Sequence, residues 1–262
     1  MDMTLEGRRA VVCGSTRGIG RACAFELAAL GAEVVLLARD KAALEATAKD
    51  LGGAAAGRHG YAAADFSDPG DVKRAIENIV QDRGGAHILI NNTGGPPGGP
   101  ALDAAADAYL DAFRAHLLCN QALAQALVPG MKEAKYGRII NIISTSVKEP
   151  IMGLGVSNTI RGAVAQWAKT LSMELGPFGI TVNNVLPGAT ETDRLAAIFK
   201  NRASKSGRTV EQEAEAMRSS IPARRFAKPE ETAAAAAFLA SPAAGYINGI
   251  NLPVDGGRTG CL

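Results

Sequence analysis

Three glycines separate a short apolar segment from a helical repeat near the start of the chain. The apolar run Arg9 to Cys13 (RAVVC) predicts a buried strand, and the turn Gly14 to Gly20 (GSTRGIG) follows it directly. Apolar residues then recur at helical spacing from Ile19 to Leu30. Glycines let a backbone approach a pyrophosphate, and the free N–H groups at a helix start attract its charge. The pattern favours dinucleotide binding over a simple tight turn.

The same alternation of strands and helices continues along the chain. Apolar runs predict further strands at residues 33–38, 61–64, 87–91, 138–143, 180–186 and 250–254. Helical spacing predicts helices at residues 41–51, 71–81, 102–132 with a break at Pro129, and 155–175. Residues 1–262 are therefore expected to form a single domain of the α/β class, a Rossmann-like doubly wound parallel sheet with helices on both faces. The polar segment Glu191 to Lys228 interrupts the alternation and is expected to form a mobile flap over a site.

Composition excludes several classes of partner. The 28 basic and 26 acidic residues leave a net charge of only +2, which is too weak to predict binding to nucleic acid or to a membrane surface. No apolar run reaches membrane-spanning length, and no secretory signal is recognisable, so we expect a cytoplasmic protein. The four cysteines lack metal-ligand spacing, so no metal site is expected. A small molecule is the expected ligand.

The choice of cofactor depends on the end of the second predicted strand. An acidic residue there would bind the adenosine 2′-hydroxyl of NAD, but the strand is followed by Arg39. Together with Arg17 of the glycine turn, Arg39 would suit the 2′-phosphate of NADP(H), because guanidinium groups bind phosphate through paired hydrogen bonds. Two alternatives stay open: Arg39 is a solvated charge, or Asp40 is the ribose-binding acid. We expect NADP(H) in preference to NAD(H).

Several motifs in order resemble those of the short-chain dehydrogenase/reductase family. They are GSTRGIG, Asp65, the segment Asn91 to Gly94 (NNTG), GRIINIIS ending at Ser144, Pro187-Gly188 and VDGG at residues 254–257. The segments GRIINIIS, GITVNNVLPG and INGINLPVDGG are most similar to bacterial β-ketoacyl-acyl-carrier-protein reductases. The resemblance implies that the cofactor is bound by Gly14, Ser15, Thr16, Arg17, Gly18, Ile19, Gly20, Arg39, Asp65, Phe66, Asn91, Gly94, Pro187, Gly188, Thr190 and Thr192.

The resemblance also implies a catalytic set of Asn, Ser, Tyr and Lys, from which this chain departs. Ser144 matches the serine, but Ser157 stands thirteen residues later where the tyrosine belongs. Arg161 replaces the lysine, so the segment reads SNTIR in place of YxxxK. His116 stands at the position of the asparagine, 28 residues before Ser144. The chain therefore resembles an atypical subgroup of the family.

The replacements change the proton transfer that the catalytic set can perform. A serine hydroxyl is a far weaker acid than a phenol, and an arginine stays protonated, so the pair Ser157 and Arg161 cannot reproduce proton transfer by Tyr and Lys. His116 and Lys148 are conceivable substitute donors, and both are equally well read as packing or surface residues.

Three functions are therefore open. The first is an NADP(H)-dependent oxidoreductase, similar to a 3-oxoacyl reductase, that acts on a carbonyl or hydroxyl substrate with an altered catalytic set. The second is a non-catalytic protein that binds NADP(H) as a sensor or oligomer partner, and the third is a non-redox isomerase or dehydratase. The resemblance also implies a homo-oligomer, a dimer or tetramer.

Overall fold

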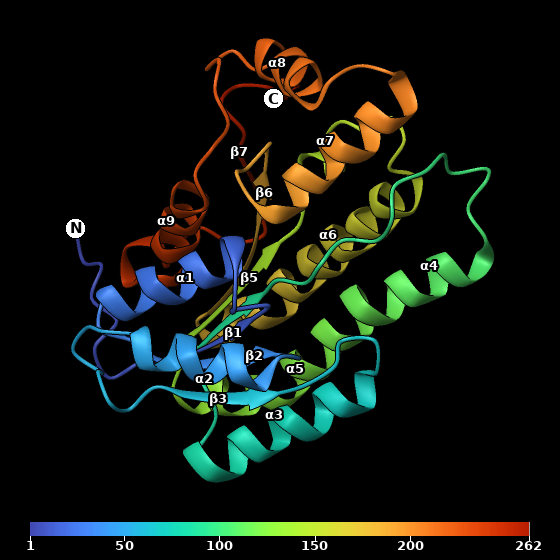
Figure 1. Cartoon of the computed structure of the whole chain (residues 1–262). Coiled ribbons are helices and arrows are strands. Elements are labelled where there is room, and N and C mark those ends of the chain that lie inside the picture. Colours follow the sequence, from blue (N-terminus) through green and yellow to red (C-terminus); the bar gives the residue numbers. More distant parts are fainter. Residues whose placement is uncertain (262) are drawn as a thin grey trace.

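A parallel sheet lies at the centre of the computed structural model, which describes residues 1–261 (Figure 1). Its seven strands are ordered β3-β2-β1-β4-β5-β6-β7. They are β1 (Arg9–Cys13), β2 (Glu33–Ala38), β3 (Gly60–Ala63), β4 (Ile88–Asn91), β5 (Gly137–Ile142), β6 (Ile180–Pro187) and β7 (Asn251–Val254). The strand order changes direction between β1 and β4, and ligands of doubly wound sheets bind beyond the carboxyl ends of such neighbours. The predicted Rossmann-like α/β class is confirmed.

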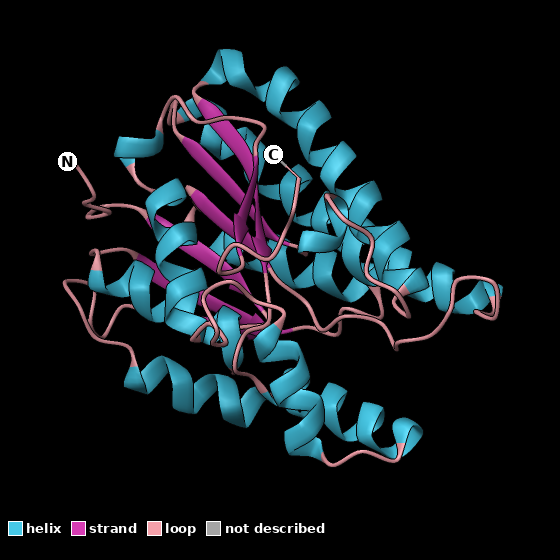
Figure 2. Ribbon diagram, turned by 90° about the horizontal axis from the view of Figure 1, so that it is seen from above, coloured by secondary structure: helices cyan, strands magenta, loops and turns pink. Residues whose placement is uncertain are grey.

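Helices cover both faces of the sheet (Figure 2). One layer holds α1 (Gly18–Ala29), α2 (Lys41–Asp50) and α9 (Pro229–Ala240), and the other holds α3 (Pro69–Arg83), α5 (Cys119–Glu133) and α6 (Gly155–Leu175). The predicted flap folds mainly as α7 (Asp193–Ser206) and α8 (Val210–Ser219), which share a small apolar cluster. Within residues 1–261, no helix is long and apolar enough to cross a membrane.

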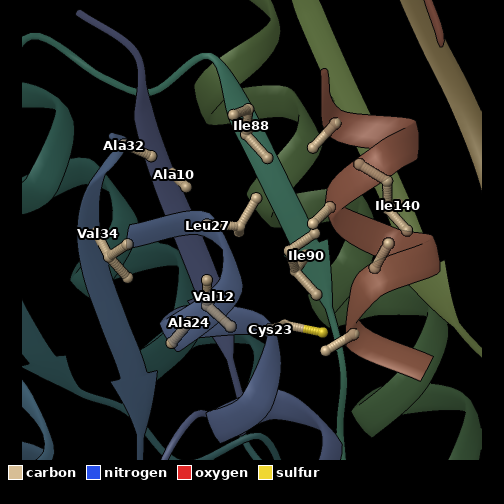
Figure 3. Close-up of a cluster of buried hydrophobic side chains, with 14 of the residues drawn as sticks. Ala10, Val12, Cys23, Ala24, Leu27, Ala32, Val34, Ile88, Ile90 and Ile140 are labelled. Atoms are coloured by element: carbon tan, nitrogen blue, oxygen red, sulfur yellow. The ribbon is translucent and has the colours of Figure 1, made fainter. Parts of the chain in front are cut away.

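Each central strand divides its side chains between two apolar cores. In β1, Val12 is buried with α1 and α9, whereas its neighbour Val11 is buried with α3 and α5. Successive side chains of a strand point to opposite faces, so a strand covered on both faces is apolar at every position. Figure 3 shows the first core, in which Cys23 and Leu27 of α1 lie beside Ile90 of β4.

Two sequence predictions about helices are wrong. The helix expected from Leu102 begins at Ala106, as α4 (Ala106–Phe113), and it continues through a π-helical turn (Arg114–Leu118) into α5. The expected break at Pro129 does not occur, since α5 runs on to Glu133. Proline removes one backbone hydrogen bond, but Leu127 and Met131 on either side are fully buried against the sheet and hold the helix in place. Helix α9 was not predicted, because its alanine-rich sequence has little periodicity.

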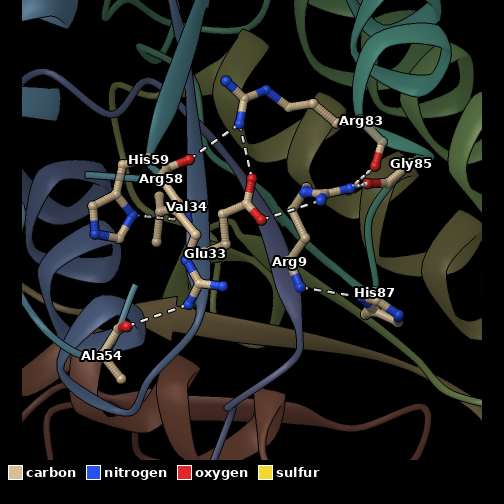
Figure 4. Close-up of polar contacts among 9 residues, drawn as sticks. All are labelled: Arg9, Glu33, Val34, Ala54, Arg58, His59, Arg83, Gly85 and His87. Carbon is tan, nitrogen blue, oxygen red and sulfur yellow. Dashed lines mark hydrogen bonds and ion pairs between the residues drawn. The ribbon is translucent and has the colours of Figure 1, made fainter. Parts of the chain in front are cut away.

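An ion-pair network ties the amino ends of the strands together (Figure 4). Glu33 at the start of β2 binds Arg9 of β1 at 3.1 Å and Arg83 of α3 at 2.8 Å. Burial alone would raise the pKa of Glu33, but the hydrogen bonds and charges of the two arginines lower it overall. This network stabilises the end of the sheet that lies opposite the carboxyl ends of the strands.

Candidate functional site

The glycine turn joins β1 to α1 in a conformation that side chains would obstruct. Gly14 and Gly18 have positive φ angles of 58° and 53°. A Cβ atom at Gly20 would lie 2.2 Å from the carbonyl oxygen of Gly14, and one at Gly14 would lie 2.6 Å from the carbonyl oxygen of Asn92. Arg17 is the N-cap residue of α1, but its side chain does not bond to the first N–H groups of the helix. These N–H groups are therefore available to a ligand. The turn is thus open to an anion.

The other residues of the turn differ in exposure. Ser15 is buried, and its hydroxyl has no hydrogen-bond partner among the described residues. Thr16 is half-buried, and Ile19 packs against the core beneath α1. Arg17 is exposed, and its guanidinium lies 3.9 Å from the carboxylate of Asp193 at the start of α7. The turn therefore presents a buried hydroxyl, helical N–H groups and an exposed cation.

The ends of β2 and β3 carry the residues expected near the adenosine. Arg39 is exposed directly after β2, whereas the carboxylate of Asp40 accepts the N–H of Ala43 at 3.0 Å and caps α2. Asp65 after β3 accepts the N–H of Ser67, and this bond, supported by the charge of Arg39, lowers its pKa. Phe66 packs partly against the second core. Asp40 thus serves the helix as a cap, and Arg39 forms no ion pair within residues 1–261.

Asn92 joins the end of β4 to the glycine turn. Its side-chain Nδ2 donates to the carbonyl oxygens of Cys13 at 3.2 Å and Gly14 at 3.3 Å. Gly94 follows in the same segment and is exposed. The two neighbouring strand ends at the switch point are therefore held together by one amide.

A ladder of asparagine side chains, three of them buried and the last half-buried, crosses four strands beside this switch point. Asn91 donates to Asn141, Asn141 donates to Asn184, and Asn184 donates to Asn251, each at 2.8 Å. The parallel register places each asparagine directly opposite the next. The side-chain amide of Asn91 therefore bonds across the sheet to Asn141, and its Oδ1 has no partner among the described residues. Sequence reasoning missed the ladder because the register is visible only once the strand order is known.

The segment after β6 returns to the glycine turn. Gly188 packs so closely on Asp255 that a Cβ atom there would lie 2.7 Å from the Cα atom of Asp255. Thr190 donates to the carbonyl oxygen of Gly188, and Thr192 caps α7 by accepting the N–H of Leu195. The methyl group of Thr192 would lie 3.2 Å from a Cβ atom at Gly18. The structure thus brings Thr192 against the predicted phosphate-binding turn.

Three of the four expected catalytic residues converge at the end of β5. Ser144 follows β5, and its Oγ accepts the N–H of Ser146 at 3.1 Å, capping a short 3-10 turn. Ser157 and Arg161 lie four residues apart on α6, so they share one helix face, and both are buried. The guanidinium of Arg161 donates to the carbonyl oxygen of Ile142 at 3.2 Å, two residues before Ser144.

His116 reaches the same region from the π-helical turn. Its side chain is buried, and its Nδ1 shares a hydrogen bond with the hydroxyl of Thr93. Burial, with the charges of Arg161 and Arg194, lowers the pKa of His116 to about 2. A π-helical turn holds an extra residue compared with an α-helical turn, and such turns often occur at functional sites. Here the π-helical turn carries a histidine that is neutral at pH 7.

Arg194 was not predicted as a site residue. It lies in the first turn of α7, is solvent-exposed, and donates to the carbonyl oxygens of Gly95 at 2.9 Å and Pro96 at 3.2 Å. These bonds hold α7 against the loop that follows β4. No sequence motif marks this residue, because its place depends on how α7 folds over the sheet.

The sheet order and the glycine turn define the class of doubly wound Rossmann-like proteins. A family model described as Enoyl-(Acyl carrier protein) reductase matches residues 14–259. The chain belongs to the short-chain dehydrogenase/reductase family.

Relatives and solved structures agree with this assignment. The 3-oxoacyl-(acyl-carrier-protein) reductase FabG of Vibrio cholerae is 33% identical over 257 residues, which cover 97% of this chain and 98% of that protein. The NADPH-dependent reductase BacG of Bacillus subtilis is 33% identical over 258 residues, which cover 95% of this chain and 97% of that protein. The L-sorbose reductase of Gluconobacter frateurii, solved with NADPH and L-sorbose, has a TM-score of 0.92, 32% identity and full coverage of both chains.

Proposed function

We propose that the protein is an NADP(H)-dependent oxidoreductase that acts on a carbonyl or hydroxyl substrate, as a 3-oxoacyl reductase does. The observation that carries this proposal is the tightly packed glycine turn between β1 and α1. In this turn Gly20 packs against Gly14, and Thr192 packs against Gly18. Similar proteins support it, since BacG of Bacillus subtilis is an NADPH-dependent reductase and the L-sorbose reductase of Gluconobacter frateurii was solved with NADPH.

The residues present fit the proposed cofactor. The unpartnered hydroxyl of Ser15 and the uncapped start of α1 suit a pyrophosphate, which accepts hydrogen bonds and carries negative charge. Arg39 is exposed at the end of β2, where the 2′-phosphate of NADP(H) would lie. Asp40 already caps α2, which favours NADP(H) over the alternative in which this carboxylate binds a ribose.

The altered catalytic set changes how the substrate oxygen is handled. Bound NADP(H) supplies or accepts a hydride at the substrate carbon, so the substrate oxygen must also gain or lose a proton. The hydroxyl of Ser144 would donate a hydrogen bond to that oxygen and stabilise its developing charge. Ser157 is too weak an acid to replace a phenol, so solvent supplies the proton and turnover is slower by about 10²–10⁴-fold than with a positioned acid.

Calorimetric titration tests the cofactor assignment. We expect the wild-type protein to bind NADPH more tightly than NADH, and Arg39→Ala to weaken NADPH more than NADH. The control Arg202→Ala removes an exposed arginine of α7 and should leave both affinities unchanged. Equal binding of the two cofactors, unaffected by Arg39→Ala, would overturn the assignment.

NADPH absorbance during challenge with a panel of ketones and aldehydes tests the activity. We expect slow oxidation that falls further in Ser144→Ala. A competing candidate is a non-catalytic NADP(H)-binding protein, favoured by the replacements at Ser157, Arg161 and His116. Tight NADPH binding without any oxidation, followed by activity in the triple variant Ser157→Tyr, Arg161→Lys and His116→Asn, would establish that candidate instead.

We also propose that the protein forms a homo-oligomer. Large apolar side chains are exposed on two helices, Leu110 and Phe113 of α4 and Met173 of α6. Such a surface suits burial against a second copy of the chain. Light scattering after size-exclusion chromatography should give a mass that is a multiple of the monomer mass, and a monomer at micromolar concentration would refute this.

A further inference from the structure

Arg161 is a buried cation without an acidic partner. Its exposed fraction is 8%, and its one hydrogen bond among the described residues goes to the carbonyl oxygen of Ile142. No carboxylate within residues 1–261 lies within 4.0 Å of its nitrogen atoms, although twelve other pairs in the protein meet that criterion. A guanidinium has five N–H donors, and burying it unpaired is costly. Most of its capacity for binding an anion is therefore unused.

A second arginine, Arg194 of α7, adds positive charge to this region. Arg194 stands exposed on α7, has no carboxylate partner among the described residues, and donates only to the carbonyl oxygens of Gly95 and Pro96. Burial and then the charge of Arg194 lower the pKa of Arg161 to about 10, and both charges act on neutral His116. Two like charges and a neutral imidazole thus leave this region electropositive, with one cation inside and one at the rim.

The position of the two arginines links them to the proposed reaction centre. Arg161 binds the last residue of β5, two residues before Ser144, and Arg194 binds the residues that directly follow Gly94. The phosphate-binding turn lies at the end of β1 and contacts Thr192, whereas Arg161 is held at the end of β5. The two arginines therefore lie at the carboxyl ends of β5 and β4, beside the proposed reaction centre.

We propose that Arg161 and Arg194 bind the carboxylate of a short oxo acid or hydroxy acid, whose reacting carbon lies one or two bonds from that carboxylate. A carboxylate matches a guanidinium through two parallel hydrogen bonds and neutralises the buried charge, which a neutral ketone does not do. In the reductive direction, the substrate carbonyl gains a hydride from NADPH at carbon and a proton from solvent at oxygen. The products are the hydroxy acid and NADP⁺.

This assignment rests on the proposed function for its reaction but not for its binding step. The first experiment is therefore calorimetric titration of the NADPH-saturated full-length protein with 2-oxo and 3-oxo acids of three to six carbons. Each acid is compared with its methyl ester and with inorganic phosphate. We expect at least one acid to bind about tenfold or more tightly than its ester, and also more tightly than phosphate.

Variants distinguish a binding role from a structural one. Arg161→Met should remove the preference for the acid over the ester, and Arg194→Met should weaken it, while Arg202→Met on the same helix α7 should leave it intact. Because an unpaired buried charge is costly, Arg161→Met should melt at the same temperature as the wild type or higher. A lower melting temperature together with a retained acid preference would show that Arg161 is only structural.

The outcomes separate this assignment from the proposed function. Acids that bind as expected without NADPH oxidation would refute only the reductase activity. Oxidation of NADPH by neutral ketones, with no gain for any acid over its ester, would overturn only the carboxylate site. Phosphate that binds as tightly as the acids and depends on Arg161 would assign the charge to a phosphate group and overturn it as well. Absence of binding by every acid would also overturn the carboxylate site.

Discussion

The imidazole Nδ1 of His116 lies 2.5 Å from the hydroxyl oxygen of Thr93, so a buried hydrogen bond joins the π-helical turn to the loop after β4. Because the pKa of His116 is lowered to about 2, the ring is neutral at pH 7 and holds no proton to release as an imidazolium. His116 therefore holds the hydroxyl of Thr93, and in the reaction proposed above its neutral ring would be a poor proton donor at pH 7.

The buried histidine makes stability depend on pH. In the unfolded chain histidine takes up a proton below about pH 6.5, whereas folded His116 does so only near pH 2. The unfolded state therefore binds more protons as the pH falls, and the wild type should lose about 2 kcal/mol between pH 7 and pH 5 from this residue. His116→Asn should lack this loss, as urea unfolding at the two pH values would reveal. An equal loss in variant and wild type would contradict the buried neutral histidine.

Gly20→Ala should disturb the glycine turn. Its Cβ atom would overlap the carbonyl oxygen of Gly14, so the turn must open. We expect a loss of about 1–3 kcal/mol in unfolding free energy and at least a tenfold loss of NADPH affinity by calorimetry.

A matched glycine serves as the control. In Gly130→Ala of α5, the added Cβ atom would meet no atom of the described residues within 4 Å apart from its chain neighbours and the backbone of its own helix. The change should raise stability by about 0.5–1 kcal/mol without changing affinity. Unchanged NADPH binding in Gly20→Ala would show that the turn does not hold the cofactor.

Asn141→Ala should break the asparagine ladder at its centre. The Nδ2 of Asn91 and the Oδ1 of Asn184 would lose their partner inside the sheet. Leaving two buried groups unpaired should cost about 2–5 kcal/mol, measured by chemical denaturation. Asn201→Ala, which removes an exposed side chain on α7, should have little effect. A loss in Asn141→Ala no larger than in Asn201→Ala would mean that the ladder contributes no net stability.

Glu33→Gln should weaken the ion-pair network at the amino ends of the strands. We expect a loss of about 1–2 kcal/mol at pH 7, between the values for exposed and buried pairs. Since the pKa of folded Glu33 is lowered, its contribution is complete above the unfolded value of about 4.3 and disappears as the pH falls through the lower folded value. The difference in melting temperature between the two proteins should therefore be smaller at pH 3 than at pH 7.

Glu45→Gln provides the comparison for that result. Glu45 is paired with Lys49 on the exposed face of α2, where solvent screens the interaction. We expect no resolvable change in melting temperature. A larger effect for Glu45 than for Glu33 would refute the role given to the network.

The strands were predictable because each carries its own local signal. β1 and β2 have the predicted bounds, since a strand buried on both faces is apolar at every position. Pro129 does not break α5 as predicted, because the packing of Leu127 and Met131 outweighs the lost hydrogen bond. Helix α9 escaped prediction because its alanines form contacts on several sides and leave no polar face.

Some residues of the candidate site were likewise predictable from the sequence, and others were not. The amino-acid sequence by itself determined the glycine turn and the replacements at Ser157 and Arg161, because backbone freedom and side-chain chemistry belong to single residues and their neighbours. Only the tertiary structure decided that Arg194 bonds to the loop after β4, that Thr192 meets Gly18 and that four asparagines align. Parallel strands are joined by crossovers that carry the chain across the sheet, so contacts of this kind depend on strand order and register rather than on local pattern.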